Sequence, residues 1–293
     1  MKVLIGLIQT MRPHQWTKNV LFVFPAIIFD AKLGELNLLL RVVVACGLLI
    51  LMSGTVYIIN DLVDVENDKQ HPTKRFRPIP SGTLPINFAR LAAIIIPLIT
   101  ISLALLFDTA LAVILILYLI LQILYSFRLK HIALLDVMSV ALGFVLRVMA
   151  GGVVINVTIS PWLYAFTGLL ALFLVTAKRR QELIKLGDTA KNTRPIFNQY
   201  NLPLLDDMLR IVTTSTLITY ILYTIEVETM TKNGVNLGLL TVPFVLYGLF
   251  RYLYLIHVEE EGSAPDEVIL KDRPMQITVG LASITFVVIL YLV

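Results

Sequence analysis

Nine stretches of about 20 mostly apolar residues run through the chain, and no other feature constrains its fold as strongly. A helix of ~20 apolar residues is long enough to cross the hydrocarbon core of a bilayer. Of the 293 residues, 57% are hydrophobic and 15% are charged, which excludes an ordinary water-soluble enzyme, a coiled coil and a disordered chain. We therefore predict an all-α polytopic membrane protein, a bundle of nine transmembrane helices that forms one domain over residues 1–293. The predicted spans are roughly 18–36, 38–60, 86–107, 109–127, 134–156, 160–178, 207–227, 238–257 and 275–293.

The positive charges are distributed unevenly, and this predicts the orientation of the chain. Of 24 Lys and Arg residues, 19 lie in the N-terminal segment and in the connections that follow every second span. Because Lys and Arg concentrate in cytoplasmic loops, we expect an integral cell-membrane protein with a cytoplasmic N-terminus and an external C-terminus. The net charge of +4 requires no nucleic-acid partner, since basic loops face anionic lipid. The cytoplasmic loops are then 61–85, 128–133, 179–206 and 258–274.

Several other classes of site are absent from the sequence. The single cysteine, Cys46, excludes a disulfide framework within one chain and a cysteine-based metal site. There is no HExxH, P-loop, GxGxxG or nucleophile-elbow motif, so the sequence gives no reason to expect a metalloprotease or a serine triad. The first residues, MKVLIGLIQT, are too short for a secretory signal and lack a cleavage site, so we expect them to stay on the chain.

The strongest chemical signal is the acidic run NDLVDVEND, which begins where the second apolar stretch ends. If the helix continues, Asn60, Asp64 and Asp68 recur at every fourth position, and Asp61 lies on the same face. Carboxylates grouped in this way repel one another unless a cation is present, and hard oxygen ligands suit a Mg²⁺ ion that is shared with substrate phosphate. A solvated acidic helix end, or a Ca²⁺-like loop, is the simpler alternative.

A basic loop that contains three prolines follows the acidic run directly. Its cations include Lys74, Arg75 and Arg77. Cations beside a carboxylate–metal site can bind the remaining charge of a diphosphate. The alternative is a loop that is basic only because it faces the cytoplasm.

Two further polar clusters lie at the cytoplasmic ends of later spans. The cluster near residue 180 places three cations in a row, which cannot all face one way on a helix, so at least one should meet lipid headgroups. Lys178 or Arg179 can pair with Glu182, and the simpler explanation of this cluster is a membrane anchor. The other cluster consists of Tyr125, Ser126, Lys130 and Asp136.

Two arginines lie within predicted spans. Arg147 lies about 16 Å beyond Asp136 along the same helix, at ~1.5 Å per residue. An arginine at that depth faces the bundle interior or a wet cavity. It either lines a cavity that opens to the cytoplasm or is a structural residue with a buried partner. Arg251 is close enough to its helix end for its charge to reach water.

The motif NDxxDxxxD at a cytoplasmic helix end, in a chain with nine predicted spans, resembles the UbiA-type prenyltransferase superfamily. The longer run NDLVDVENDKQHPTKRFRPIPSG is similar to the decaprenyl-phosphate phosphoribosyltransferase branch of that superfamily. The same is true of RPHQWTKN at residues 12–19 and of YSFRLK, LDVMSVALGFVLRVMAGG and AKRRQEL further along. The resemblance covers about residues 10–200, and the last 90 residues match only in their number of helices.

The resemblance implies an active-site cavity open to the cytoplasm and a specific group transfer. Members of this branch move phosphoribosyl from 5-phosphoribosyl 1-diphosphate (PRPP) to a polyprenyl phosphate and release diphosphate, in a pathway that supplies cell-wall precursors. By this resemblance Asn60, Asp61, Asp64 and Asp68 hold Mg²⁺, and Asp64, Asp68 and Asp136 are catalytic candidates, with Asp136 close to the ribose or the metal. The substrate-binding candidates are Lys18, Lys74, Arg75, Arg77, Tyr125, Ser126, Lys130, Arg147, Lys178 and Arg179.

One departure from the superfamily pattern bears on the substrate. Members that use prenyl diphosphate carry a second aspartate-rich motif near the end of the sixth helix, where this chain has KRRQE. One acidic and one basic cluster favour a metal-bound sugar diphosphate together with a lipid monophosphate. The alternatives are a UbiA-type enzyme that moves a prenyl group to an aromatic or other acceptor, and a transporter or channel, which would need ionisable residues near the midplane. The length of the lipid and the formation of a homo-oligomer stay open.

Overall fold

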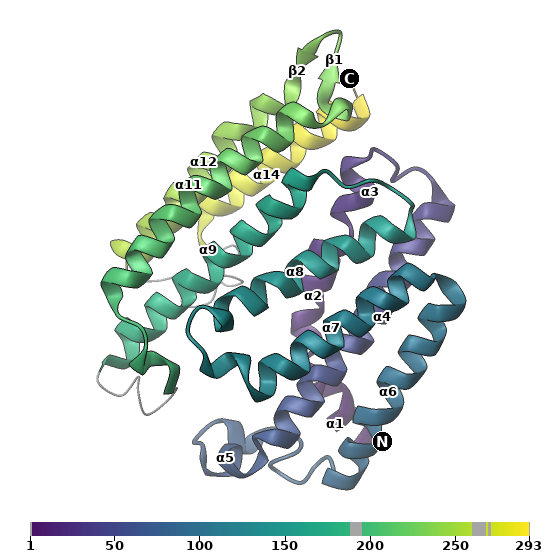
Figure 1. Cartoon of the computed structure of the whole chain (residues 1–293), viewed down its shortest axis with the longest axis vertical. Coiled ribbons are helices and arrows are strands. Elements are labelled where there is room, and N and C mark those ends of the chain that lie inside the picture. Colours follow the sequence, from purple (N-terminus) through teal and green to yellow (C-terminus); the bar gives the residue numbers. More distant parts are fainter. Residues whose placement is uncertain (1, 188–194, 260–267, 269–270, 293) are drawn as a thin grey trace. The chain divides into compact units, whose positions relative to one another are not determined.

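The computed structural model describes residues 2–187, 195–259, 268 and 271–292, and in these the regular elements are helices apart from one short hairpin (Figure 1). The chain divides into two compact units. Unit 1 contains Met1–Ile28, Lys32–Phe127 and Leu146–Thr158, and unit 2 contains Phe29–Ala31, Arg128–Val145 and Ile159–Val293. Helix α8 (Leu135–Val154) therefore contributes its first half to unit 2 and its second half to unit 1.

Unit 1 is organised around its longest helix, α4, which contacts α1, α2, α6 and α7 (Figure 1). The apolar run that forms α4 continues into the acidic motif, so one helix carries both the membrane span and the first acidic residues. The elements of this unit are α1 (Lys2–Thr10), η1 (Pro13–Gln15), α2 (Trp16–Val23), α4 (Leu36–Val63), α5 (Val65–Gln70), η2 (Lys74–Phe76), α6 (Ile86–Phe107) and α7 (Thr109–Phe127).

The first predicted span, 18–36, is not one helix. The chain there forms α2 and then α3 (Pro25–Phe29), with Phe24 between them. Proline fits the first turn of a helix but not its interior, because it has no N–H group to donate, so the helix restarts at Pro25. Ala31 follows with a φ of 55°, which ends the helical path.

Eight helices in the described part of the chain are long and apolar enough to cross a membrane, which identifies an integral membrane protein. The predicted count of nine is not confirmed, since the first stretch is split. The other eight predicted spans are each found, seven of them with ends within about five residues of the prediction, while the span predicted at 160–178 extends further, to Leu186. They are Leu36–Val63, Ile86–Phe107, Thr109–Phe127, Leu135–Val154, Pro161–Leu186, Leu202–Glu226, Leu237–His257 and Arg273–Leu292.

Ionic clusters mark both ends of α4. Near its start, Arg41 donates hydrogen bonds to the Val154 carbonyl and, at 3.0 Å, to Asp108. Asp108 also accepts hydrogen bonds from the first free N–H groups of α7, so this aspartate caps that helix. At the other end, Asp61 lies in the last turn of α4 and pairs with arginines. The helix therefore has an apolar middle between two charged ends.

Unit 2 is built from long helices that pack in pairs, α9 with α11 and α12 with α14 (Figure 1). Its core contains Phe173, Leu209, Tyr252, Ile256 and Met275. A two-residue turn with Gly234 at a φ of 78° closes a small antiparallel hairpin, in which Thr231 pairs with Asn236. The elements are η3 (Leu129–His131), α9 (Pro161–Leu186), η5 (Pro195–Asn198), α11 (Leu202–Glu226), η6 (Glu228–Met230), β1 (Thr231–Lys232), β2 (Val235–Asn236), η7 (Leu237–Thr241), α12 (Val242–His257), α14 (Arg273–Val287) and the π-helical turn Val288–Leu292.

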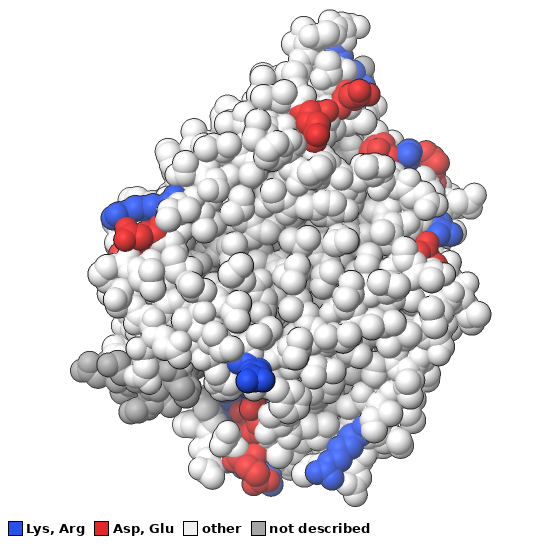
Figure 2. All heavy atoms as spheres, in the orientation of Figure 1, with Lys and Arg blue, Asp and Glu red and all other residues white. Residues whose placement is uncertain are grey.

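Two of the predicted loops differ from expectation or lie partly outside the described residues. Helix α9 continues to Leu186, two turns beyond its predicted end at 178, so the KRRQE segment is helical and not part of a loop. Residues 188–194 of the predicted loop 179–206, and most of the predicted loop 258–274, lie outside the described residues. On the face drawn in Figure 2, charged side chains are few and most of the visible surface is uncharged, as expected of a surface in contact with lipid.

Candidate functional site

The acidic motif spans the junction of two consecutive helices. Helix α4 stops at Val63 and α5 starts at Val65, and Asp64 forms the junction. The Asp64 N–H still donates to the Asn60 carbonyl at 3.0 Å, and the Asp68 N–H donates to the Asp64 carbonyl at 2.8 Å. The helical pattern of main-chain hydrogen bonds therefore continues across Asp64 although the helix is interrupted there.

Two of these carboxylates converge on one guanidinium. The Nη1 atom of Arg77 lies 3.2 Å from Asp61 Oδ1 and 2.7 Å from Asp68 Oδ2. Both carboxylates are buried, with side chains only 3% and 4% exposed. A buried carboxylate requires a partner of opposite charge, and Arg77 serves both. The prediction that Arg77 lies beside the acidic motif is confirmed.

Arg12 is a second arginine on Asp61. Its Nη2 atom lies 2.9 Å from Asp61 Oδ1, and its guanidinium lies 4.5 Å from the centre of the Tyr57 ring, one turn earlier on α4. The backbone of Arg12 is left-handed, with a φ of 53°, and Pro13 starts the next helical turn. This turn directs the N-terminal segment across the end of α4.

An open pocket of about 270 Å³ lies beside these ion pairs. Arg12, His14 and Arg77 line it together with Asp61. Two of its lining side chains, Arg12 and Arg77, are positively charged and one, Asp61, is negatively charged, so the lining carries a net positive charge. An anion such as a phosphoryl group matches this lining.

The remaining candidates in this loop differ in position. Lys74 Nζ lies 3.7 Å from Asp68 Oδ1, within reach of the cluster. Arg75 is exposed and stacks on the Phe76 ring at 4.8 Å, with no contact to Asp61 or Asp68 in the described structure. Among the residues that the structure describes, no three His, Cys, Asp or Glu side chains are grouped closely enough to hold a metal ion by themselves.

A second buried cluster, in unit 2, is centred on Asp136 at the start of α8. The side chain of Asp136 is fully buried, and its Oδ2 accepts a hydrogen bond from Arg179 Nε at 3.0 Å. Arg179 Nη1 also donates to Glu182 Oε2 at 3.0 Å, as the spacing of three residues predicts. Two carboxylates thus fix the orientation of a buried arginine at the end of α9.

Tyr200 completes this second cluster. Its hydroxyl donates to Asp136 Oδ1 at 2.6 Å and accepts from the Leu134 N–H at 2.8 Å. Burial, together with the hydrogen bond to the Asp136 carboxylate, raises the pKa of Tyr200 well above its usual range, so the phenol stays protonated. The phenol therefore acts as a permanent hydrogen-bond donor that holds the segment after η5 against the start of α8.

The three adjacent cations of α9 have three different environments, as their angular spacing on a helix requires. Lys178 is exposed, which agrees with a side chain that meets lipid headgroups or solvent. Arg180 is buried and pairs with Asp206 at 2.6 Å, and it donates to the Ile256 carbonyl at the end of α12. Arg180 therefore ties α9, α11 and α12 together.

Arg147 is buried within unit 1 and is held by polar neighbours. Its Nε donates to Asn19 Oδ1 at 2.8 Å, and its Nη2 donates to the Tyr118 hydroxyl at 2.7 Å. Asn19 in turn donates to the Ser53 hydroxyl at 3.1 Å. These contacts join α2, α4, α7 and α8, and they favour the structural explanation of Arg147 over a role in lining a cavity.

The other predicted substrate-binding residues are dispersed. Ser126 is buried and donates back to the Gln122 carbonyl of its own helix, so its hydroxyl is already used. Tyr125, Lys18 and Lys130 are half-buried. Arg251, the other arginine within a predicted span, pairs with Asp272 at 2.7 Å, so a carboxylate as well as solvent stabilises its charge.

Sequence reasoning left out two residues of these clusters. Arg12 lies in the segment RPHQWTKN, directly before the first apolar stretch. The predicted topology places this segment on the same side of the membrane as the acidic motif, which was a sufficient reason to count Arg12 among the candidate site residues. Tyr200 gave no such signal, since it lies 64 residues from Asp136 in a polar connection.

Known proteins resemble this chain in sequence and in fold. A decaprenyl-phosphate phosphoribosyltransferase of Corynebacterium glutamicum is 32% identical over 93% of this chain and 82% of its own length. The protein of that name from Mycobacterium tuberculosis is 29% identical over 93% of this chain and 90% of its own length. The structure of a UbiA homolog from Archaeoglobus fulgidus bound to DMAPP and Mg²⁺ superposes with a TM-score of 0.71 at 16% identity, covering 98% of this chain and all of that one. Such low identity shows the fold alone.

The sequence model of the UbiA prenyltransferase family matches residues 19–268, which is most of the chain. Both buried clusters lie within or next to that range. The protein is thus a membrane-embedded enzyme that belongs to the UbiA prenyltransferase family.

Proposed function

We propose that this enzyme transfers 5-phosphoribosyl from PRPP to a decaprenyl-type polyprenyl phosphate at the cytoplasmic face of the cell membrane and releases diphosphate. The observation that carries the proposal is the convergence of Asp61 and Asp68 on Arg77, beside a pocket that Arg12 and His14 also line. The names of the relatives from Corynebacterium and Mycobacterium support the same reaction.

The acidic motif is the proposed Mg²⁺ site. Asp61 Oδ1 and Asp68 Oδ2 already lie within 3.2 Å of one cationic nitrogen, so these oxygen atoms suit a shared positive charge. Asn60 and Asp64, on the same helical path, are the further proposed ligands, and Asp64 and Asp68 are the proposed catalytic carboxylates. When bound, Mg²⁺ would supply positive charge to the oxygen atoms of the diphosphate.

The basic side chains around this motif bind and orient the donor in the proposed reaction. Arg12, Lys74 and Arg77 lie on or near the carboxylates, so each can pair with phosphate oxygen atoms that approach them. Arg75 is exposed and would act on the outer part of the donor. The main task of these residues is to stabilise the leaving diphosphate and to align the sugar.

The lipid phosphate is the nucleophile in this scheme. Its oxygen forms a bond to the anomeric carbon, the bond from that carbon to diphosphate breaks, and the transition state has oxocarbenium character. A phosphate monoester has a second pKa of about 6, so no protein base is needed at neutral pH. Lys178 and Arg179 are the proposed lipid-phosphate ligands, and Asp136 orients Arg179 through their 3.0 Å hydrogen bond. The further proposed substrate contacts are Lys18, Tyr125 and Lys130, while Ser126 and Arg147, whose polar groups bind other groups of the protein, are proposed as structural residues.

The arrangement in the membrane is part of the proposal. The distribution of Lys and Arg supports a cytoplasmic N-terminus, an external C-terminus and a cavity that opens to the cytoplasm. We also propose that α2 and α3 together form the ninth crossing, and that both units belong to one membrane domain. A sizing measurement of the purified protein would show whether it forms a homo-oligomer.

The test is a transfer assay with the purified protein in detergent. Radiolabelled PRPP, a polyprenyl phosphate and Mg²⁺ should give label in the organic-extractable lipid, and the Asp68→Asn variant should lose roughly 100-fold or more of the rate. Asp207→Asn is the matched control, because Asp207 is exposed and pairs only with Arg210 in the described structure. Prenylation of an aromatic acceptor from a prenyl diphosphate, with no transfer from PRPP, would replace this proposal by the prenyltransferase alternative.

A further inference from the structure

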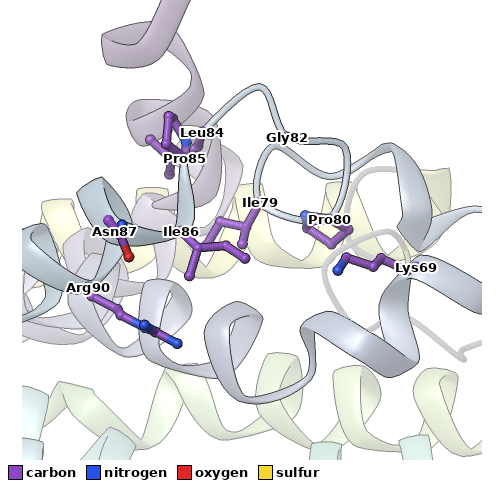
Figure 3. Close-up of a pocket in the computed structure, with 9 residues that line it drawn as sticks. All are labelled: Lys69, Ile79, Pro80, Gly82, Leu84, Pro85, Ile86, Asn87 and Arg90. Atoms are coloured by element: carbon purple, nitrogen blue, oxygen red, sulfur yellow. The ribbon is translucent and has the colours of Figure 1, made fainter.

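A second pocket lies outside the acidic cluster, beside the start of the spanning helix α6. It is open, with a volume of about 580 Å³. Its floor is apolar, because Ile79 and Leu84 are almost fully buried there and Ile86 lies next to them. In Figure 3 the side chains of Lys69 and Arg90 reach toward the hollow from two sides. The pocket thus combines an apolar floor with two cations.

The charge of this pocket is positive and not neutralised from within. None of its nine lining residues is acidic. Arg90 is exposed and has no hydrogen bond or ion pair with any described residue. Lys69 pairs with Glu66 at 2.8 Å, but both side chains are exposed, and such surface pairs are weak enough for the lysine to turn to another anion.

The pocket continues into a surface that faces lipid. Arg90 lies in the second turn of α6, and Leu91, Ile94 and Leu98 follow on that helix as exposed apolar side chains. Asn87, Arg90, Ile94 and Leu98 are spaced by three or four residues, so they form one stripe along the helix. Exposed apolar residues on a spanning helix contact acyl chains, and the end of such a helix lies at the depth of the headgroups. A ligand of this stripe therefore has an anionic head and apolar tails.

We propose that this pocket binds the headgroup of an anionic phospholipid. Lys69 and Arg90 pair with its phosphate oxygen atoms, Asn87 lies within the same pocket as a hydrogen-bonding group, and the acyl chains run along Ile94 and Leu98. Basic pockets at the ends of membrane helices recognise anionic headgroups by this combination of charge and apolar contact. The site is separate from the acidic cluster and does not depend on the proposed reaction.

The test is lipid binding to the intact protein in detergent, measured by native mass spectrometry. Phosphatidylglycerol should bind more tightly than phosphatidylcholine. A cation near the membrane surface is worth about fivefold in affinity, so Arg90→Gln should lower phosphatidylglycerol affinity about fivefold and the double variant with Lys69→Gln about thirtyfold. Arg90→Lys, which keeps the charge, should retain most of the binding.

The matched control is Arg128→Gln, which removes an exposed arginine outside the pocket. Equal losses in Arg128→Gln and Arg90→Gln would overturn the proposal in favour of general surface charge. Unchanged binding in the double variant would overturn it directly. Inorganic phosphate is the soluble probe: if it competes at the same concentration as the lipid, the pocket is a free-phosphate site and the acyl contacts contribute nothing. Comparable melting temperatures of the variants would verify that each is folded.

Discussion

Replacing Gly151 by alanine should separate two helices that the structure holds unusually close. A Cβ atom at Gly151 of α8 would lie 2.0 Å from the carbonyl oxygen of Val23 in α2, and 2.9 Å from its carbonyl carbon. These atoms belong to the backbone and cannot rotate away, so α2 must shift by roughly 1.4 Å or more to bring the 2.0 Å approach to an ordinary contact distance of at least 3.4 Å. Overpacking of this kind costs ~1–3 kcal/mol.

The same shift would break a hydrogen bond one turn away. Arg147 precedes Gly151 by one turn on α8, and Asn19 precedes Val23 by one turn on α2, so the 2.8 Å bond between them crosses the same interface. Losing a buried hydrogen bond to a charged group adds about 1.5–3 kcal/mol. The total loss of stability is then ~3–6 kcal/mol. At roughly 2–4 °C per kcal/mol for a large domain, the melting temperature should fall by ~6–24 °C.

Gly47→Ala is the matched control for this measurement. Gly47 lies within α4, and a Cβ atom there would have no neighbour within 4 Å. Alanine is up to ~1 kcal/mol more favourable than glycine in a helix interior, so this variant should melt at or slightly above the wild-type temperature. Thermal unfolding in detergent, followed by size-exclusion chromatography, measures both. A Gly151→Ala protein that melts with the wild type would refute the close contact between α2 and α8.

Three further predictions concern the clusters. Tyr200→Phe should lower the free energy of unfolding by ~2–4 kcal/mol, because it removes the donor to Asp136 and strands one backbone N–H; a melting curve unchanged within error would contradict the role assigned to Tyr200. Arg251 holds the pKa of Asp272 below its usual value, so the native state binds fewer protons than the unfolded chain. The contribution of this ion pair to the free energy of unfolding is therefore present above about pH 4 and is lost as the pH falls. Asp272→Asn, which keeps the helix cap, should therefore melt at a lower temperature than the wild type at pH 7, and its melting temperature should fall less as the pH is lowered. Melting temperatures of the variant and the wild type that change in parallel with pH would contradict this prediction. Chelation of divalent cations should abolish phosphoribosyl transfer while phosphatidylglycerol binding persists, and loss of both would contradict the separation of the two sites.

The sequence was sufficient for eight of the spans and for the grouping of Asp61 and Asp68, because both are local patterns. Hydropathy over ~20 residues identifies a membrane helix whatever it packs against, and i, i+4 spacing fixes which side chains share a helical face. Asp61, Asp68 and Arg77 were therefore identified together without a structure. The break at Pro25 had a local signal as well, but a long apolar stretch outweighed it.

The partners of buried charges could not be predicted in the same way. Both oxygen atoms of Asp136 accept hydrogen bonds, from Arg179 and Tyr200, which lie 43 and 64 residues away in the sequence. Which distant residue neutralises a buried charge depends on how helices pack, and no spacing rule reports that. For the same reason the sequence did not distinguish Arg180, a structural residue, from Arg179 beside it.

The two ionic clusters at the ends of α4 also define a length. Arg41 and Asp61 lie ~30 Å apart along the helix at ~1.5 Å per residue, which matches the hydrocarbon thickness of a typical bilayer. Because both ends are tied to neighbouring helices by charged contacts, α4 cannot easily shorten its apolar section. In a thinner bilayer the helix would have to tilt, and in a thicker one the lipid would have to compress around it. Unit 1 is thereby matched to one membrane thickness, and hydrophobic mismatch acts directly on the helix that carries the acidic motif.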